Sequence, residues 1–220
     1  QQRVAVARAL VFDPQLVLMD EPLGALDKNL REEMQYEIKH IHESLGVTVV
    51  YVTHDQAEAL TMSNRIAVFD DSIVQQLAAP DVLYEKPDNA FVAGFIGENN
   101  RLMGKVTAIE GDICNVELEG GGGAVQALRV NVGAVGDRTT LSLRPERVTI
   151  SPADGATDNA CPARVEELIY LGDHIRTRLT VSGNDQFIVK VPNAHGHILL
   201  NRGDEVNVGW ATEDCRALDA

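Results

Sequence analysis

Two adjacent carboxylates, Asp20 and Glu21, directly follow a short apolar run in LVLMDEP. The run predicts a buried strand, and a carboxylate at its end lies at the C-terminal edge of a parallel sheet, where open α/β sheets bind ligands. Asp20 is suited to hold Mg²⁺, directly or through water, and Glu21 to orient and deprotonate a water for attack on a phosphate. A plain surface turn is the alternative interpretation.

His54 and Asp27 extend this candidate site. A second apolar strand, residues 47–53, ends at His54 and is followed by a polar turn and a short helix in VVYVTHDQAEAL. Placed on the same sheet edge, His54 suits contact with a phosphate oxygen, and packing or capping is the alternative. Asp27, in LGALD, predicts an N-cap for the helix that follows, alone or together with a functional role.

The elements that must position these residues alternate between strand and helix, which is typical of a parallel α/β sheet. Both strands are expected to be buried, the second on both faces. The pattern predicts helices over residues 1–12, 27–46 and 55–63, a strand–turn–strand over 65–80, and a helix in two pieces, broken at Pro87, over 81–97.

After about Asn100 the sequence changes to short alternating apolar runs separated by Gly and Asp, which is typical of an all-β domain. Residues 120–123, four glycines, predict a hairpin or loop, because no Lys-Ser/Thr and no helix follow them as in a phosphate cradle. We therefore expect two domains, residues 1–97 and 98–220.

The second domain repeats weakly. Gly136-Asp137 leads through TTLSLRP to Glu146, and Gly203-Asp204 leads through EVNVGWAT to Glu213. Upstream, GKVTAIEGD and ARVEELIYLGD match in the same order. Two related β units explain this pattern, and chance similarity of Gly-Asp turns is the alternative.

Composition excludes several classes of protein. The net charge of −14 argues against nucleic acid or an anionic membrane as the main partner. The sequence holds no run of about 18 apolar residues, so we expect no membrane span. Its three cysteines, Cys114, Cys161 and Cys215, are widely spaced, which predicts reduced thiols of a cytosolic protein.

In chain order, QQRVAVARAL, LVLMDEPLGALD and VTVVYVTHDQAEAL resemble three elements of the ATP-binding subunit of ABC transporters. The resemblance implies that Asp20 is the Walker B aspartate that holds Mg²⁺ and that Glu21 is the catalytic glutamate. It implies that Asp27 is the D-loop aspartate and that His54 is the switch histidine that contacts the γ-phosphate. Gln1 matches the position directly after the signature sequence of that family and is thereby assigned to nucleotide binding.

The sequence lacks other parts of the family pattern. It contains no G-x-x-x-x-G-K-[ST], no adenine-stacking aromatic, no Q-loop and no signature sequence, all of which the family places before the position of Gln1. The resemblance is therefore to the C-terminal part of such a subunit, and we expect a fragment whose start has been removed and which is inactive alone. It implies an incomplete P-loop NTPase parallel sheet in residues 1–97.

The missing phosphate-loop strand has a physical consequence. In the family fold it lies between the strands at residues 47–53 and 65–69. We therefore expect the apolar edges there to be exposed or paired with another chain. We also expect impaired stability, or a rearranged or swapped contact, in the isolated chain.

The β domain resembles the transport-associated OB module of importer ATPases in LSLRPERVTI and YLGDHIRTRLTV. This implies an OB-like barrel domain and an importer, and FVAGFIGENNRLMGKV and GWATEDCRALD are most similar to the spermidine/putrescine group. The resemblance implies ATP and Mg²⁺ as cofactors. It implies a second ATPase subunit, transmembrane permease subunits and, indirectly, a solute-binding protein as partners, with a peripheral place at the cytoplasmic face of the inner membrane.

Other functions remain open from the sequence. Sugar and ferric-iron importers carry the same module, and the chain could be a non-catalytic dimerisation or regulatory module. Nucleic-acid binding by the barrel requires aromatic platforms and positive charge. Tyr170, Phe187 and Trp210 are present, but 12 Lys and Arg against 18 Asp and Glu leave residues 98–220 at −6, so we expect no nucleic-acid partner. We expect Trp210 in the core and Arg144 in a structural salt bridge.

Overall fold

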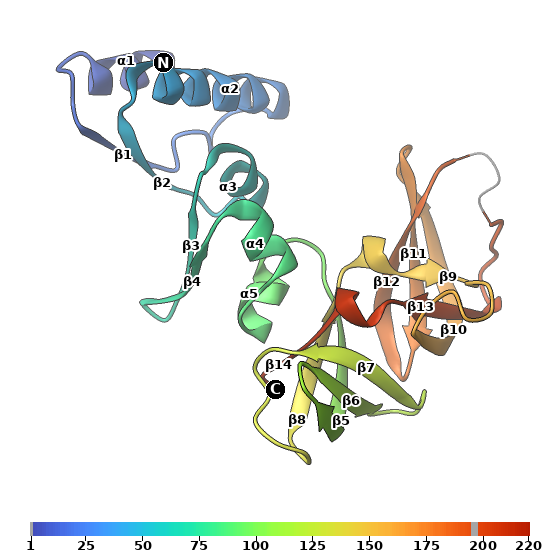
Figure 1. Cartoon of the computed structure of the whole chain (residues 1–220). Coiled ribbons are helices and arrows are strands. Elements are labelled where there is room, and N and C mark those ends of the chain that lie inside the picture. The colour runs from blue at the N-terminus through green and yellow to red at the C-terminus, as the bar shows by residue number, and fades with distance from the viewer. Residues whose placement is uncertain (1, 195–197) are drawn as a thin grey trace. The chain divides into compact units, whose positions relative to one another are not determined.

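The computed structural model describes residues 2–194 and 198–220, and the chain divides into two compact units, Gln1–Lys86 and Pro87–Ala220 (Figure 1). The first unit contains α1 (Gln2–Leu10), β1 (Leu16–Asp20), α2 (Lys28–Leu45), β2 (Thr48–Val52), α3 (Gln56–Met62), β3 (Ile66–Asp70), β4 (Ile73–Ala78) and α4 (Pro80–Glu85). The second contains α5 (Ala90–Phe95), β5 (Asn100–Glu110), β6 (Ile113–Leu118), β7 (Ala124–Arg129), β8 (Arg138–Leu143), the 3₁₀ turn η1 (Pro145–Arg147), β9 (Thr149–Ile150), β10 (Asn159–Tyr170), β11 (His174–Val181), β12 (Asn184–Pro192), β13 (Glu205–Trp210), the 3₁₀ turn η2 (Thr212–Asp214) and β14 (Cys215–Leu218). The helix α5, which the sequence pattern groups with residues 1–97, therefore falls in the second unit.

In the first unit, β1 and β2 pair in parallel, with Leu16 opposite Thr48 and Asp20 opposite Val52. The 18-residue helix α2 connects them, as a parallel crossover requires. Its ends are set by the predicted caps. Asp27 accepts a hydrogen bond from the Leu30 N–H at 3.1 Å, and Gly46 ends the helix in the left-handed conformation at φ 65°.

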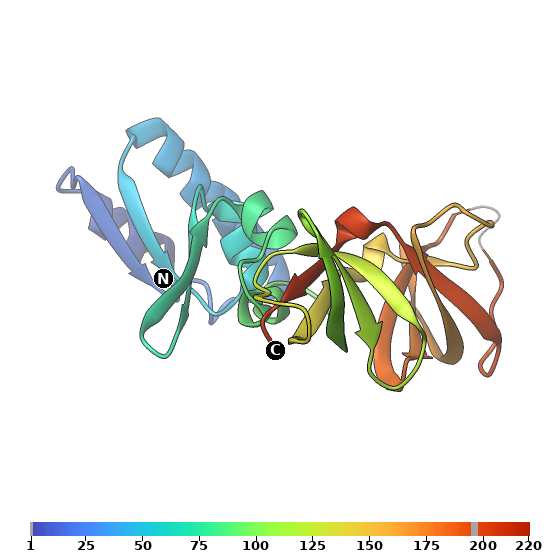
Figure 2. The same ribbon diagram turned by 60° about the horizontal axis from the view of Figure 1, so that its bottom comes forward.

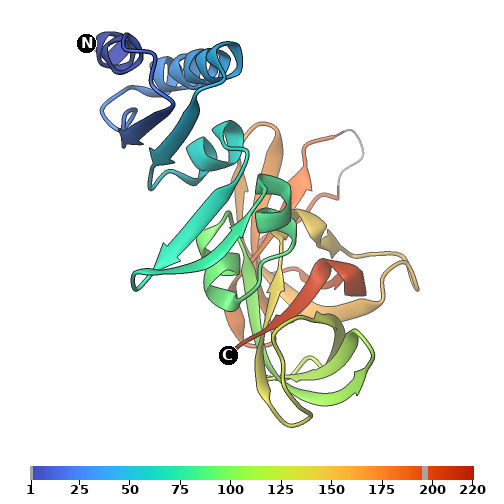
Figure 3. The ribbon, with the colours of Figure 1, turned by 60° about the vertical axis from the view of Figure 1, so that its left-hand side comes forward.

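The prediction that β2 is buried on both faces is wrong, and β1 is also buried on one face alone. Leu18, Val50 and Val52 are 72%, 47% and 53% exposed. The reason is that α1 and α2 lie together on one side of the strand pair (Figure 3), where their apolar residues surround Val17 and Met19. Strand alternation then directs every second side chain away from this core.

The strands β3 and β4 form a separate antiparallel hairpin, and no strand pairing joins it to β1–β2 in the part of the chain that the structure describes. Its outward residues Phe69 and Ile73 are 64% and 63% exposed. Among the described residues, β2 pairs with β1 alone and β3 with β4 alone, so each has an unpaired edge within residues 47–53 and 65–69, as expected. Reduced stability and a swapped contact remain predictions.

The second unit is built from two five-stranded sheets, as the all-β prediction requires. One is a closed barrel in the order β14-β7-β6-β5-β8 (Figure 2), and the other is a sheet in the order β12-β11-β10-β13-β9. They share one core, in which Phe187 is fully buried and Trp210 is 1% exposed, so the prediction for Trp210 is confirmed. The three cysteines are free and buried in the same core.

The two halves of this unit repeat the same hydrogen bonds around an aspartate, one to its side chain and one to its backbone carbonyl. Asp137 Oδ2 accepts from the Ala134 N–H at 2.8 Å, and Asp204 Oδ2 accepts from the Asn201 N–H at 2.7 Å. The carbonyls of the two aspartates accept from Val106 and Val165, each at 2.9 Å. A strand and a 3₁₀ turn follow each aspartate, β8–η1 and β13–η2. These matching contacts support the proposal that the two halves are related.

Two buried asparagines join the halves reciprocally. Asn100 on β5 donates to the Ile188 carbonyl and accepts from the Ile188 N–H on β12, at 2.7 Å each. Asn159 on β10 makes the same pair of bonds to Gln126 on β7, at 3.0 and 2.7 Å. Each carboxamide thus pairs with one backbone donor and one backbone acceptor, and those of Ile188 would otherwise be buried without partners.

Arg144 is buried and lies beneath the end of α5. Its Nη1 donates to the carbonyls of Ala93, Ile96 and Glu98 at 3.1, 2.7 and 3.1 Å. A guanidinium at a helix C-terminus satisfies free carbonyls and interacts favourably with the helix dipole. These bonds give Arg144 a structural role through backbone carbonyls, and the predicted salt bridge of Arg144 remains a prediction. Within residues 2–194 and 198–220, no helix is long and apolar enough to cross a membrane.

We predict that the two units unfold separately in urea. Six buried residues form the described core cluster of the first unit, against 23 in the second. The helices lie mostly in the first unit, and Trp210 lies in the second. The helical circular dichroism signal should therefore be lost at a lower urea concentration than that at which the fluorescence of Trp210 changes. Asn100→Ala leaves both backbone groups of Ile188 unpaired and should lower the free energy of unfolding in the Trp210 transition alone, by about 2–6 kcal/mol.

The control is Asn207→Ala, because that side chain is exposed on β13. It should move neither transition. A single transition seen by both probes, or equal shifts from the two variants, would contradict the prediction.

Candidate active site at the carboxyl ends of β1 and β2

The structure brings Glu21 and His54 together, although 33 residues separate them in sequence. His54 Nδ1 lies 2.8 Å from Glu21 Oε1 in a hydrogen bond, and the side chains are 76% and 50% exposed, respectively. The strand register explains their meeting, because Asp20 lies opposite Val52 and the Glu21 N–H donates to the Val52 carbonyl at 2.9 Å. The candidate site therefore lies where the sequence predicted it, at the carboxyl ends of two parallel strands.

Glu21 has a backbone conformation that is uncommon for a side-chain-bearing residue. Its φ is 42°, in the left-handed region. The chain turns there from β1 into the loop of residues 21–27, where Gly24 N–H donates to the Glu21 carbonyl at 3.3 Å and the fully buried Leu23 anchors the loop to the core. Strained residues of this kind cluster at functional sites, where the surrounding structure imposes them.

The hydrogen bond that His54 donates to the Glu21 carboxylate raises the pKa of His54 above its ordinary value. The negative charge of Glu21 adds to this effect. Desolvation lowers the pKa in opposition, and the charges of Asp55 and Glu58 raise it by smaller amounts. The imidazolium form is therefore favoured in the folded chain. A histidine in that form is both a donor through two nitrogens and a positive charge.

Asp20 is exposed at the end of β1 and is the oxygen donor that best fits Mg²⁺. In the described residues no three His, Cys, Asp or Glu side chains form a metal-binding group. Mg²⁺ is commonly held by one or two carboxylates, with phosphate oxygens and water completing the octahedron. The residues present therefore fit Mg²⁺ that arrives with a phosphate, with Asp20 as the protein ligand.

The other two predicted site residues, Asp27 and Gln1, have no described contact with the Glu21–His54 pair. Asp27 is exposed, six residues after Glu21, and its described contact is the cap of α2. The cap interpretation is confirmed, and a functional role for Asp27 remains a prediction. Gln1 lies outside the described residues.

The sequence did not reveal a polar network behind His54. The carboxylate of Glu58, 3% exposed on α3, accepts from Tyr51 Oη and Thr53 Oγ1 at 2.8 Å each. Arg31 Nη1 donates to Asp55 Oδ2 at 3.0 Å, and its Nε lies 3.7 Å from Glu58 Oε1. A glutamate three residues after the helix cap Asp55 looks in sequence like an ordinary capping pair, so no local signal pointed to this burial.

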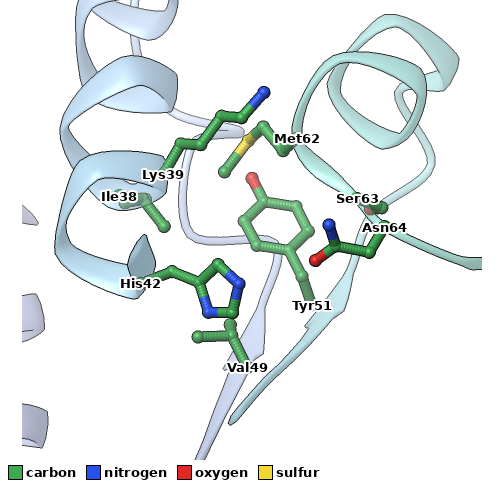
Figure 4. A pocket seen from close by; sticks show the side chains of 8 residues that line it. All are labelled: Ile38, Lys39, His42, Val49, Tyr51, Met62, Ser63 and Asn64. Atoms are coloured by element: carbon green, nitrogen blue, oxygen red, sulfur yellow. The ribbon is translucent and has the colours of Figure 1, made fainter. Parts of the chain in front are cut away.

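Tyr51 also lines a small cavity beside the network (Figure 4). Its ring lies between Ile38 and His42 of α2 and Met62 at the end of α3. Burial and the hydrogen bond to Glu58 raise the pKa of Tyr51, so its hydroxyl remains a donor to that carboxylate. The cavity has a volume of about 60 Å³, which is too small for a nucleotide. It therefore belongs to the packing that holds β2 against α2.

A wider groove of about 830 Å³ lies in the second unit, lined in part by Asn99, Arg101, Glu119 and Asn184. Its lining includes none of the residues predicted for phosphate chemistry. The predicted site residues Asp20, Glu21, Asp27 and His54 all belong to the first unit.

We predict that His54 titrates above about 6.5, the ordinary value for histidine, and that Glu21→Gln lowers this pKa toward that value. The stability that the pair contributes is present in full below the unfolded-state pKa. It is lost as the pH rises through the higher folded-state pKa. The measurement is a pH titration of the His54 ring signals by NMR.

The control Glu43→Gln removes an exposed carboxylate elsewhere on α2 and should leave the titration of His54 unchanged. Identical titration curves for wild type and Glu21→Gln would show that the pair does not form in solution.

Comparison with known proteins relates this chain to a family. The "Spermidine/putrescine import ATP-binding protein PotA" of Rubrobacter xylanophilus is 43% identical over 220 residues, which cover 99% of this chain and 57% of that protein. The protein of the same name from Pseudomonas aeruginosa is 43% identical over 96% of this chain and 59% of its own length, and that from Trichormus variabilis is 39% identical over 100% and 58%. The chain thus spans less than two thirds of the length of these relatives.

The second unit has a further match. Residues 141–218 match the TOBE domain family. Among solved structures, the cytoplasmic molybdate-binding protein ModG aligns with a TM-score of 0.46 and 17% identity, over 55% of this chain and 96% of that protein. The chain is therefore a homologue, over nearly its whole length, of the spermidine/putrescine import ATP-binding proteins, and it carries a TOBE domain.

Proposed function

We propose that this chain is the C-terminal part of the ATP-hydrolysing subunit of an ABC importer, and that β1 and β2 belong to an incomplete P-loop NTPase sheet. The observation that carries the proposal is the Glu21–His54 hydrogen bond at the carboxyl ends of two parallel strands, directly beside Asp20. Homology to import ATP-binding proteins favours this chemistry over the many others that paired carboxylates support.

Each residue has a separate part in the proposed hydrolysis. Glu21 orients the attacking water and accepts its proton, because Oε2 remains open while Oε1 bonds to His54. His54 donates to the γ-phosphate and offsets its developing charge. Asp20 would hold Mg²⁺, which would supply neutralisation of the phosphate charge. Asp27, which caps α2, couples this site to the second site of a dimer.

The described chain supplies one side of such a site. The sequence contains no G-x-x-x-x-G-K-[ST], the loop whose backbone N–H groups surround the phosphates. The exposed apolar side chains of Leu18, Val50 and Val52 further suggest that β1 and β2 pack against additional protein in the active assembly. We therefore propose that this chain has no ATPase activity alone.

The proposed solute class is a polyamine, since the relatives are import ATP-binding proteins for spermidine and putrescine. The proposed partners are a second ATPase subunit, transmembrane permease subunits and, through them, a solute-binding protein. The subunit would lie at the cytoplasmic face of the membrane. A sugar or ferric-iron importer is the alternative within the family.

The experiment is ATP hydrolysis by a chimera in which this chain replaces the matching region of the Rubrobacter xylanophilus relative. Glu21→Gln should lower kcat by about 100-fold or more, because it removes the base while preserving shape. The matched control Glu43→Gln should leave kcat unchanged. Full turnover in the Glu21→Gln chimera would refute the assignment of Glu21.

The same chimera separates the alternatives. Cells that lack their own polyamine importer and carry the chimera with the permease should take up labelled spermidine, and Glu21→Gln should abolish uptake. Hydrolysis with no stimulation by spermidine and its binding protein would favour another solute. An unmodified chimera that binds the permease without hydrolysing ATP would favour a regulatory module.

A further inference from the structure

One guanidinium touches both loops of the candidate site. Arg31 lies in the first turns of α2, and its Nη2 donates to the Leu26 carbonyl at 3.2 Å, in the loop that begins at Glu21. Its Nη1 donates to Asp55 Oδ2 at 3.0 Å, directly after His54. The planar fork of arginine makes two such bonds in different directions, which a lysine ammonium does not reproduce in the same geometry.

The two carboxylate oxygens of Asp55 accept hydrogen bonds from different parts of the chain. Oδ1 caps α3 by accepting from the N–H groups of Ala57 and Glu58, at 2.9 and 3.2 Å. Oδ2 accepts from Arg31. The cap alone would fix α3, so the bond to Arg31 adds a second constraint that ties the turn at His54 to α2.

The buried carboxylate of Glu58 reinforces this connection. It lies 3.7 Å from Arg31 Nε and binds the hydroxyls of Tyr51 and Thr53. Thr53 Oγ1 in turn accepts from the Asp55 N–H at 2.9 Å. Thr53 and Asp55, on either side of His54, are therefore held by contacts that lead back to Arg31.

His54 and Glu21 lack burial of their own to fix them. With 76% and 50% of their side chains exposed, their 2.8 Å hydrogen bond depends on where the backbone places them. The two backbone segments concerned are the loop of residues 21–27 and the turn of residues 53–55.

We propose that Arg31 is a positioning residue that couples the loop of residues 21–27 to the turn at His54 and thereby sets the geometry of the Glu21–His54 pair. The catalytic meaning of this coupling rests on the proposed function. The coupling itself is a property of the folded chain without nucleotide.

The test is amide hydrogen exchange of the whole chain, measured by NMR without nucleotide. Asp55→Asn keeps the cap of α3, because asparagine caps as well as aspartate, and removes the charge from the acceptor of Arg31. We expect the amides of Gly24 and Leu26, on the far side of Arg31, to exchange about three to ten times faster. The amide of Ile38, within α2, should be unchanged.

The second variant makes this a double-mutant cycle. Arg31→Lys keeps the charge but loses the fork, so the amides of Gly24 and Leu26 should already exchange faster, and Asp55→Asn should then add less than about twofold. Arg65→Lys, an exposed arginine outside the network, is the matched control and should change nothing.

Three outcomes would overturn the proposal. The first is unchanged amide exchange at Gly24 and Leu26 in Asp55→Asn, and the second is an equal fold-change from Asp55→Asn in the wild type and in Arg31→Lys. The third is an equal increase in exchange at Ile38, which would indicate general loosening of the unit. Asp55→Asn alone decides the question if Arg31→Lys does not fold.

The catalytic consequence is measured separately in the chimera. Arg31→Lys should lower kcat per bound ATP about tenfold, with the amount of ATP bound at saturation unchanged. Coupling in the exchange experiment together with full turnover in Glu21→Gln would refute the proposed function and leave the positioning role intact. Loss of turnover in Glu21→Gln together with no coupling in the exchange experiment would support the proposed function and refute the positioning role of Arg31.

Discussion

The candidate site depends on the register of two short parallel strands. Asp20 lies opposite Val52, and the bond from the Glu21 N–H to the Val52 carbonyl extends the pairing by one residue. A slip of one residue would turn every side chain of β2 to the other face and carry His54 away from Glu21. The register is held by the buried side chains of β1 against α2, and by the network of Glu58 and Arg31 at the end of β2.

The two units obtain their stability in different ways. The second unit joins two sheets around one core, and the buried side chains of Asn100 and Asn159 bond reciprocally to backbone of the opposite sheet. The first unit carries the proposed chemistry on a smaller core, with apolar strand faces exposed. Because the apolar core of the first unit is smaller, its polar network has a larger part in holding the site residues in place than a similar network would have in the second unit.

Local sequence signals predicted much of this structure. Asp27 and Gly46 set the ends of α2 through bonds within a few residues, and the sheet-edge argument placed Glu21 beside His54. One-sided burial of β2 was not predictable, because a continuous apolar run is the same whether or not a second layer covers it. The contact of Arg31 with Asp55 spans 24 residues and that of Asn100 with Ile188 spans 88, so neither leaves a pattern within any sequence window.

The protonation of His54 connects the geometry to the proposed chemistry. Because Nδ1 donates its hydrogen to Glu21, a neutral ring would present Nε2 as an acceptor, which cannot donate to a phosphate oxygen. The imidazolium donates through both nitrogens at once. Glu21 raises the pKa of His54 and so favours the form in which His54 keeps its bond to Glu21 while Nε2 donates to a phosphate. Removing the carboxylate would therefore remove the base and also weaken the phosphate donor, which is why the two residues act as one unit in the proposed reaction.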